Sequence, residues 1–217
     1  MKRSHQVFIA GATGYMGQRA IPALLARGHR VRALAREGSR GKLPAGSEAV
    51  VGNALDETTF DSRVAPADTF LQLVGVSHPS PAKAAEFRSV DLVSVKASAK
   101  AAAGAGVSHF VYVSVAQPAP VMKAYVQARA EGEEAIRAAG LNATFVRPWY
   151  VLGPGHRWPY FFLPFYWLLE RYPPSRDTAR RLRPVTLAQM IAALVFAVEN
   201  PAQGIRIVET PEIRRAR

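Results

Sequence analysis

The chain has 217 residues, of which 49% are hydrophobic and 20% are charged, proportions typical of a folded domain and not of a disordered or collagen-like chain. It contains no cysteine, which excludes disulfides, thiolate metal sites and a thiol nucleophile. Twenty-eight Lys and Arg against 16 Asp and Glu give a formal net charge of +12, which favours anionic ligands or surfaces.

Short apolar runs alternate with helical patterns along the chain. The expected strands cover 7–10, 31–34, 49–51, 70–74, 110–113, 143–146 and 205–208. The expected helices cover 15–27, 84–103, 123–139 and 187–199, and a Gly or Pro follows each one closely. This alternation predicts an α/β fold, a doubly wound parallel sheet (Rossmann) with helices on both faces and a small C-terminal cap.

The domain and its location are predicted from the same pattern. We expect a single domain over 1–217, in which 149–184 forms a small substrate or cap segment. No apolar stretch reaches the roughly 20 residues that a membrane span needs, and the apolar run near the start is too short for a secretion signal. A cytoplasmic protein is the expectation.

A glycine-rich loop follows the first expected strand and leads into the first expected helix. Its residues are Gly11, Ala12, Thr13, Gly14, Tyr15, Met16 and Gly17. Glycine permits a tight turn, and the free N–H groups at a helix start attract phosphate. In this strand–helix context the loop predicts contact with the pyrophosphate of a dinucleotide, the alternative being a purely structural turn.

The end of the second expected strand indicates which dinucleotide binds. A carboxylate there hydrogen-bonds the ribose of NAD, whereas a basic residue accepts the 2′-phosphate of NADP. Arg36 occupies this position, and its planar guanidinium suits a phosphate. The sequence therefore favours NADP over NAD, although the neighbouring Glu37 could bind a ribose and Arg36 could be a solvated charge.

Several further motifs follow the glycine loop in a fixed order. They are Gly52-Asn53-Ala54-Leu55-Asp56, Val113-Ser114, Tyr125-x-x-x-Arg129, Arg147-Pro148 and Leu152-Gly153-Pro154-Gly155. With this set, from about residue 6 to 208, the chain resembles the short-chain dehydrogenase/reductase superfamily, in its atypical and extended branches (NmrA-like and epimerase-like). The resemblance implies that Asn53 and Ala54 lie near the adenine, that Val74 and Gly75 touch the cofactor ribose, and that Pro148 belongs to the cofactor site.

The same resemblance implies a catalytic set of Ser114, Tyr125 and Arg129. In the family a Ser polarises the substrate carbonyl, a Tyr is the general acid/base, and a Lys one turn later holds the ribose and lowers the Tyr pKa. Arg129 stands where the family has Lys. It keeps the positive charge but cannot give up a proton to a relay. Ser114 and Tyr125 could instead line the cofactor site without chemistry, and His78 could face the substrate or solvent.

Two functions from different classes remain open. The first is an NADP(H)-dependent oxidoreductase that transfers a hydride to or from an apolar carbonyl or quinone-like substrate. The second is a non-catalytic NADP(H)-binding sensor or assembly protein, similar to NmrA-like members. An epimerase is less favoured because the substrate region is short.

Ten of the chain's 20 aromatic residues lie between 149 and 172. They could form a lid over an apolar or aromatic substrate, a subunit or peripheral membrane contact, or part of the core. A group of arginines follows, namely Arg171, Arg176, Arg180, Arg181 and Arg183. These could contact anionic lipid, an acidic substrate or only solvent. No nucleic-acid motif and no metal-ligand spacing is present, so neither partner is predicted, and a homodimer is left open.

Overall fold

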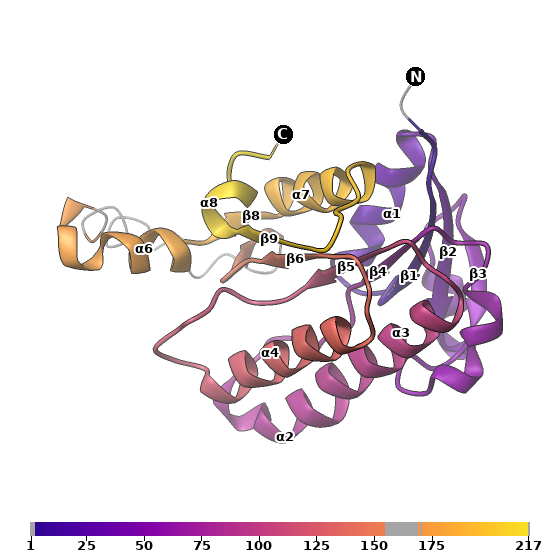
Figure 1. The fold of residues 1–217 in the computed structure, drawn as a ribbon, viewed down its shortest axis with the longest axis horizontal. Helices are drawn as coiled ribbons and strands as arrows, with labels where there is room; N and C mark the ends of the chain where they lie inside the picture. Colours follow the sequence, from indigo (N-terminus) through magenta and orange to yellow (C-terminus); the bar gives the residue numbers. More distant parts are fainter. Residues whose placement is uncertain (1–2, 155–168, 170, 217) are drawn as a thin grey trace.

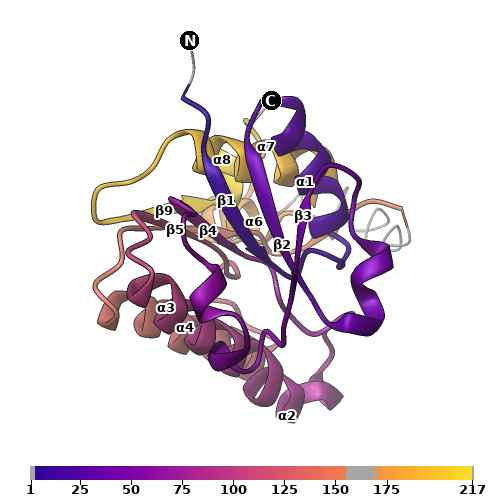
Figure 2. The same cartoon turned by 90° about the vertical axis from the view of Figure 1, so that its right-hand side faces the viewer.

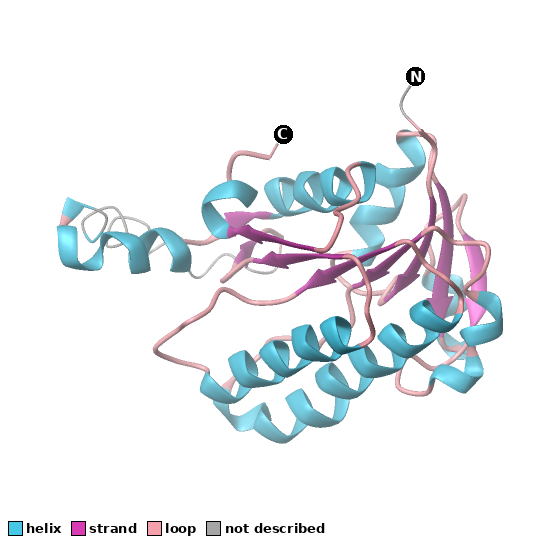
Figure 3. Ribbon diagram, viewed as in Figure 1, coloured by secondary structure: helices cyan, strands magenta, loops and turns pink. Residues whose placement is uncertain are grey.

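The computed structural model describes residues 3–154, 169 and 171–216. Its centre is a seven-stranded parallel sheet in the order β3-β2-β1-β4-β5-β6-β9 (Figure 1; Figure 3). Its strands are β1 (Gln6–Ala10), β2 (Arg30–Ala35), β3 (Glu48–Val51), β4 (Thr69–Gln72), β5 (His109–Val113), β6 (Ala143–Arg147) and β9 (Ile205–Glu209). The predicted doubly wound parallel sheet is confirmed.

Helices cover both faces of this sheet (Figure 1; Figure 2). They are α1 (Gly17–Ala26) and α7 (Leu187–Glu199) on one face, and α3 (Val93–Gly104) and α4 (Lys123–Ala138) on the other. Because successive side chains of a strand point to opposite faces, β1 supplies Val7 and Ile9 to the core under α1 and α7, and Phe8 to the core under α3 and α4. Burial on both faces explains why these strands read as continuous apolar runs.

The helix predicted over 84–103 is interrupted by an irregular turn. It begins as α2 (Ala84–Glu86), passes through a π-helical turn at Phe87–Leu92 and continues as α3. A π turn adds a residue to the helical repeat, and such turns are frequent at functional sites. Here it carries the buried Asp91. Apolar periodicity does not reveal this interruption.

Several short elements were not predicted. Between 150 and the C-terminus they are β7 (Val151–Leu152), β8 (Val185–Thr186), α6 (Arg176–Leu182) and α8 (Thr210–Ile213). The 3-10 turns are η1 (Glu37–Lys42), η2 (Glu57–Thr59), η3 (Asp61–Arg63), η4 (Pro81–Lys83) and η7 (Pro173–Ser175). Most of the aromatic segment, residues 155–168 and 170, lies outside the described residues, so the cap over 149–184 stays a prediction. No helix in the described part of the chain is long and apolar enough to cross a membrane.

Candidate cofactor and active site

A cavity of about 300 Å³ lies at the carboxyl ends of the central strands. Residues after β1, β4, β5 and β6 line it together with the start of α4. Of the predicted site residues it brings together Gly11, Gly14, Tyr15, Met16, Gly75, Ser114, Tyr125, Arg129 and Pro148. Open α/β sheets bind ligands at this edge, because the loops after parallel strands meet there. His78, for which the sequence left substrate and solvent as alternatives, also lines the cavity.

The glycine loop is folded tightly against β4. Gly11 has φ +86°, and a Cβ at this position would lie 2.7 Å from the carbonyl carbon of Leu73. A Cβ at Gly17 would lie 2.4 Å from the Gly11 carbonyl oxygen, so both positions require glycine. The first turn of α1 carries no acidic residue and no side-chain cap. The partial positive charge of this helix start fits the pyrophosphate of a dinucleotide, while the Gln18 and Arg19 N–H groups bond to the Gly14 and Met16 carbonyls of the loop. Ala12 is buried under the loop and Thr13 is half-exposed.

The residues predicted for the adenosine half lie outside the cavity, along the same edge of the sheet. Arg36 follows β2 and is exposed, and no other described residue forms a hydrogen bond or ion pair with its guanidinium. Asn53 follows β3, and its Oδ1 accepts a hydrogen bond from the Leu55 N–H at 3.1 Å. This turn uses the side-chain oxygen of Asn53, so the side-chain NH₂ group stays available to a ligand. Ala54 packs against the core.

Tyr125 and Arg129 share one face of α4, as their spacing predicts. The Arg129 Cζ atom lies 5.2 Å from the centre of the Tyr125 ring, which is tilted against Phe87. The Arg129 side chain is buried, and its Nη1 donates to the Val113 carbonyl at 2.8 Å. Val74 and Gly75, predicted to touch a ribose, lie against the same guanidinium.

A buried carboxylate holds this arginine. Arg129 Nη2 lies 2.6 Å from Asp91 Oδ1, and Asp91 Oδ2 accepts from the Val76 N–H at 3.0 Å. Burial raises the pKa of Asp91, and the charge of Arg129 acts in the opposite direction. The cation beside Tyr125 is therefore paired with an anion, which weakens its field at the tyrosine. Asp91 was not among the predicted site residues; a lone carboxylate between Phe87 and Leu92 was the available signal.

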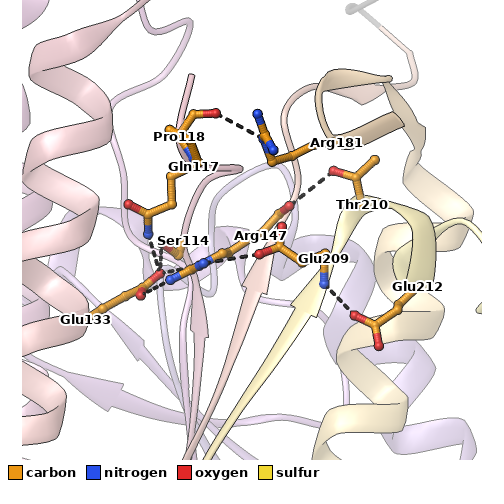
Figure 4. Close-up of polar contacts among 9 residues, drawn as sticks. All are labelled: Ser114, Gln117, Pro118, Glu133, Arg147, Arg181, Glu209, Thr210 and Glu212. Carbon is orange, nitrogen blue, oxygen red and sulfur yellow. Dashed lines mark hydrogen bonds and ion pairs between the residues drawn. The ribbon is translucent and has the colours of Figure 1, made fainter. Parts of the chain in front are cut away.

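Ser114 is buried at the end of β5, and its hydroxyl donates to Glu133 Oε1 at 2.6 Å (Figure 4). Glu133 is itself buried and is held by Arg147, whose Nε lies 2.8 Å from Oε1. Gln117 donates to the same oxygen at 3.0 Å, and Arg147 also binds Glu209 at 3.1 Å. Since a serine has a single hydroxyl proton, Ser114 faces the cavity as an acceptor.

Glu133 was also missed. It lies four residues after Arg129 on α4, so the spacing of Tyr125, Arg129 and Glu133 places all three on one helix face. The grouping with Ser114 and Arg147 depends on how β5 and β6 lie beside α4, which the sequence pattern does not specify. Among the described residues, no group of three or more His, Asp or Glu side chains is placed to hold a metal.

The parallel sheet, the glycine loop before α1 and the cavity at the carboxyl edge define a dinucleotide-binding α/β protein. The chain belongs to the NAD(P)H-binding family, whose model matches residues 11–156. The predicted NAD(P)-binding family is confirmed, and the predicted likeness to the short-chain dehydrogenase/reductase superfamily is confirmed at the level of the fold.

Individual relatives give a more detailed comparison. The chain is 29% identical over 213 residues to the ceramide reductase of Caulobacter vibrioides, covering 96% of this chain and 65% of that protein, so it spans just under two thirds of that relative's length. The Bordetella bronchiseptica enzyme WbmH in complex with NAD⁺ is similar in structure, at 19% identity and TM-score 0.69, over 96% of this chain and 76% of that one. The UDP-glucose 4-epimerase of Thermus thermophilus in complex with NAD is similar at 17% identity and TM-score 0.66, over 96% and 81%. At these identities the two structures support the fold alone.

Proposed function

We propose that the protein is an NADP(H)-dependent reductase that acts on the carbonyl group of an apolar, lipid-like molecule. The observation that carries this proposal is that the glycine loop and Tyr125, with Arg129 beside it, line one cavity. The similarity to a ceramide reductase supports a lipid-like substrate, as do the apolar side chains of Leu73, Val76 and Trp149 in the cavity. A quinone-like acceptor is also apolar and also carries carbonyl groups, so it is part of the same proposal.

The side chains of the cavity divide the work of carbonyl reduction. When bound, the dinucleotide supplies the hydride to the carbonyl carbon. Tyr125 donates its hydroxyl proton to the carbonyl oxygen, so that the product is an alcohol. Arg129 remains charged throughout and stabilises the phenolate that Tyr125 leaves behind, and Asp91 holds Arg129 in place.

The test is NADPH oxidation with a panel of long-chain ketones, long-chain aldehydes and quinones, comparing the native protein with Tyr125→Phe. Loss of a general acid should lower kcat/KM by a factor of about 100 or more. Ser62→Ala is the control, because it removes an exposed hydroxyl on η3, outside the cavity lining. Tight NADPH binding without turnover of any acceptor would exclude the reductase.

A non-catalytic NADP(H)-binding sensor is the second candidate. Two observations favour it: the Ser114 proton is engaged by Glu133, and the Arg129 charge is paired with Asp91. Both features reduce the catalytic strength of the site without affecting the glycine loop. A sensor would bind NADPH and, when NADPH is bound, change its association with a partner. For such a protein Tyr125→Phe should alter neither NADPH binding nor the association with the partner.

A further inference from the structure

A second hollow, of about 810 Å³, lies between α6, the segment after α8 and the loop that follows β5. Four arginines line it, Arg180 and Arg181 from α6 and Arg214 and Arg215 from the chain after α8, and we call it the arginine groove. Two carboxylates, Asp177 and Glu209, also line it. The oxygen Oε1 of Glu209 is engaged by Arg147, which lies outside the groove lining, so cations exceed anions in the groove.

The groove has a fixed floor. Arg181 Nε donates to the Pro118 carbonyl at 3.1 Å, which ties α6 to the loop after β5 (Figure 4). Beneath this contact, in the view of Figure 4, the buried Glu133 pairs with the partly buried Arg147, which also binds Glu209. Like charges brought together on such a frame repel one another, and an anion placed among them relieves the repulsion. Guanidinium groups bind the oxygens of phosphate in pairs, which makes phosphate the best matched anion.

Exposed apolar side chains lie on two segments that contribute to the groove or lead into it. Val121 is 55% exposed and lies in the same loop as Pro118, and Tyr172 is 62% exposed and lies shortly before α6. Figure 1 shows that α6 and the loop leading into α4 project from the same end of the molecule. Tyrosine and aliphatic side chains beside arginines are the combination that binds the interface of an anionic membrane.

We propose that the arginine groove, together with the exposed Val121 and Tyr172 on adjoining segments of the chain, docks the protein on a membrane by binding the phosphate of an anionic phospholipid. The exposed apolar side chains favour a lipid over a soluble phosphate, which offers nothing to bury against them. No aromatic side chain lines the groove among the described residues, so it lacks the stacking platform of a nucleic-acid site. This surface is separate from the cavity, and docking requires neither cofactor nor turnover.

The experiment is flotation of the full chain with vesicles of phosphatidylcholine alone and with phosphatidylglycerol added. The double variant R180Q/R215Q removes two exposed cations of the groove. The control R3Q/R30Q removes two exposed cations near the amino ends of β1 and β2, so the change in net charge is the same. We expect binding only to phosphatidylglycerol vesicles, with R180Q/R215Q weakening it about 30-fold and R3Q/R30Q less than about threefold.

The remaining outcomes overturn the proposal. Equal weakening by the two double variants would show that the net charge alone binds the vesicles. Absence of vesicle binding, together with a saturable rise in Tm on adding inorganic phosphate that R180Q/R215Q abolishes, would assign the groove to a soluble phosphate. Absence of both vesicle binding and the phosphate-dependent rise in Tm would show that the groove binds neither anion. NADPH oxidation by R180Q/R215Q on a water-soluble carbonyl substrate is measured separately, so failure of docking and failure of the reductase proposal are distinguished.

Discussion

The Ser114 hydroxyl bonds to a buried carboxylate, and this argues against a role as donor to a substrate oxygen. A hydroxyl-to-carboxylate bond of 2.6 Å is charge-assisted, and breaking it would leave Glu133 without one of its donors in a buried site. We therefore predict that Ser114→Ala changes kcat/KM less than about fivefold, whereas removing a donor to the developing oxyanion would cost about 100-fold or more.

The same variant has a structural readout. Ser114→Ala should lower the free energy of unfolding by about 1–3 kcal/mol, because the Glu133 carboxylate loses a buried hydrogen bond. Urea unfolding measures the stability, and steady-state kinetics measures the turnover. If Ser114→Ala abolished turnover at unchanged stability, the serine would be acting on the substrate.

Arg36 determines the choice between NADP and NAD if its exposed guanidinium holds the 2′-phosphate. Arg36→Ala should then weaken NADPH binding about 10- to 100-fold, because a charge-assisted bond to phosphate is lost, and leave NADH binding within about threefold. Fluorescence titration of both cofactors measures the effect. Arg30→Ala, at the opposite end of β2, is the control with the same loss of charge. An equal loss for both cofactors would show that Arg36 contacts something other than the 2′-phosphate.

At the scale of elements, the π turn at Phe87–Leu92 brings the helix formed by α2 and α3 into contact with the candidate site. It carries Asp91, which binds Arg129 on α4 and the Val76 N–H in the loop after β4. Asp91→Asn should lower the free energy of unfolding by about 3–5 kcal/mol, because it leaves a buried guanidinium without its counter-ion. Urea unfolding of D91N and of D91N/R129M measures this, and we expect the double variant to recover part of the loss. If both variants lost the same stability, the cost would come from the turn and not from the ion pair.

The sequence predicted those features that depend on neighbouring residues. The glycine loop, the apolar strands and the shared face of Tyr125 and Arg129 follow from local geometry, and the structure has all of them. The partners of these residues were not predictable, since Asp91 and Arg129 are far apart in the chain and meet only when the π turn at Phe87–Leu92 packs against α4. For the same reason the arginines of α6 could be recognised as a group, but not their meeting with Arg214 and Arg215.

At the scale of the whole molecule, the two edges of the sheet differ in chemistry. The carboxyl edge holds the cavity, whereas the amino edge holds buried histidines, among them His109 at the start of β5. Its Nε2 lies 3.0 Å from Thr144 Oγ1 on β6, and Thr144 also accepts a bond from Arg206 at 2.9 Å. Burial, reinforced by the charge of Arg206, lowers the pKa of His109 to about 4. The folded protein therefore keeps this imidazole neutral at pH values where an unfolded histidine takes up a proton.

This difference predicts an acid-sensitive fold. The unfolded chain binds the proton near its ordinary pKa of about 6.5, so the stabilisation is complete above that pH and is lost progressively as the pH falls toward about 4. At about 1.4 kcal/mol per pKa unit, His109 accounts for about 3 kcal/mol of the stability lost over that interval. Urea unfolding at pH 7 and at pH 4.5 should show that His109→Gln has a flatter pH dependence than the native protein. Parallel curves for His109→Gln and the native protein would mean that other groups, such as carboxylates, cause the acid sensitivity.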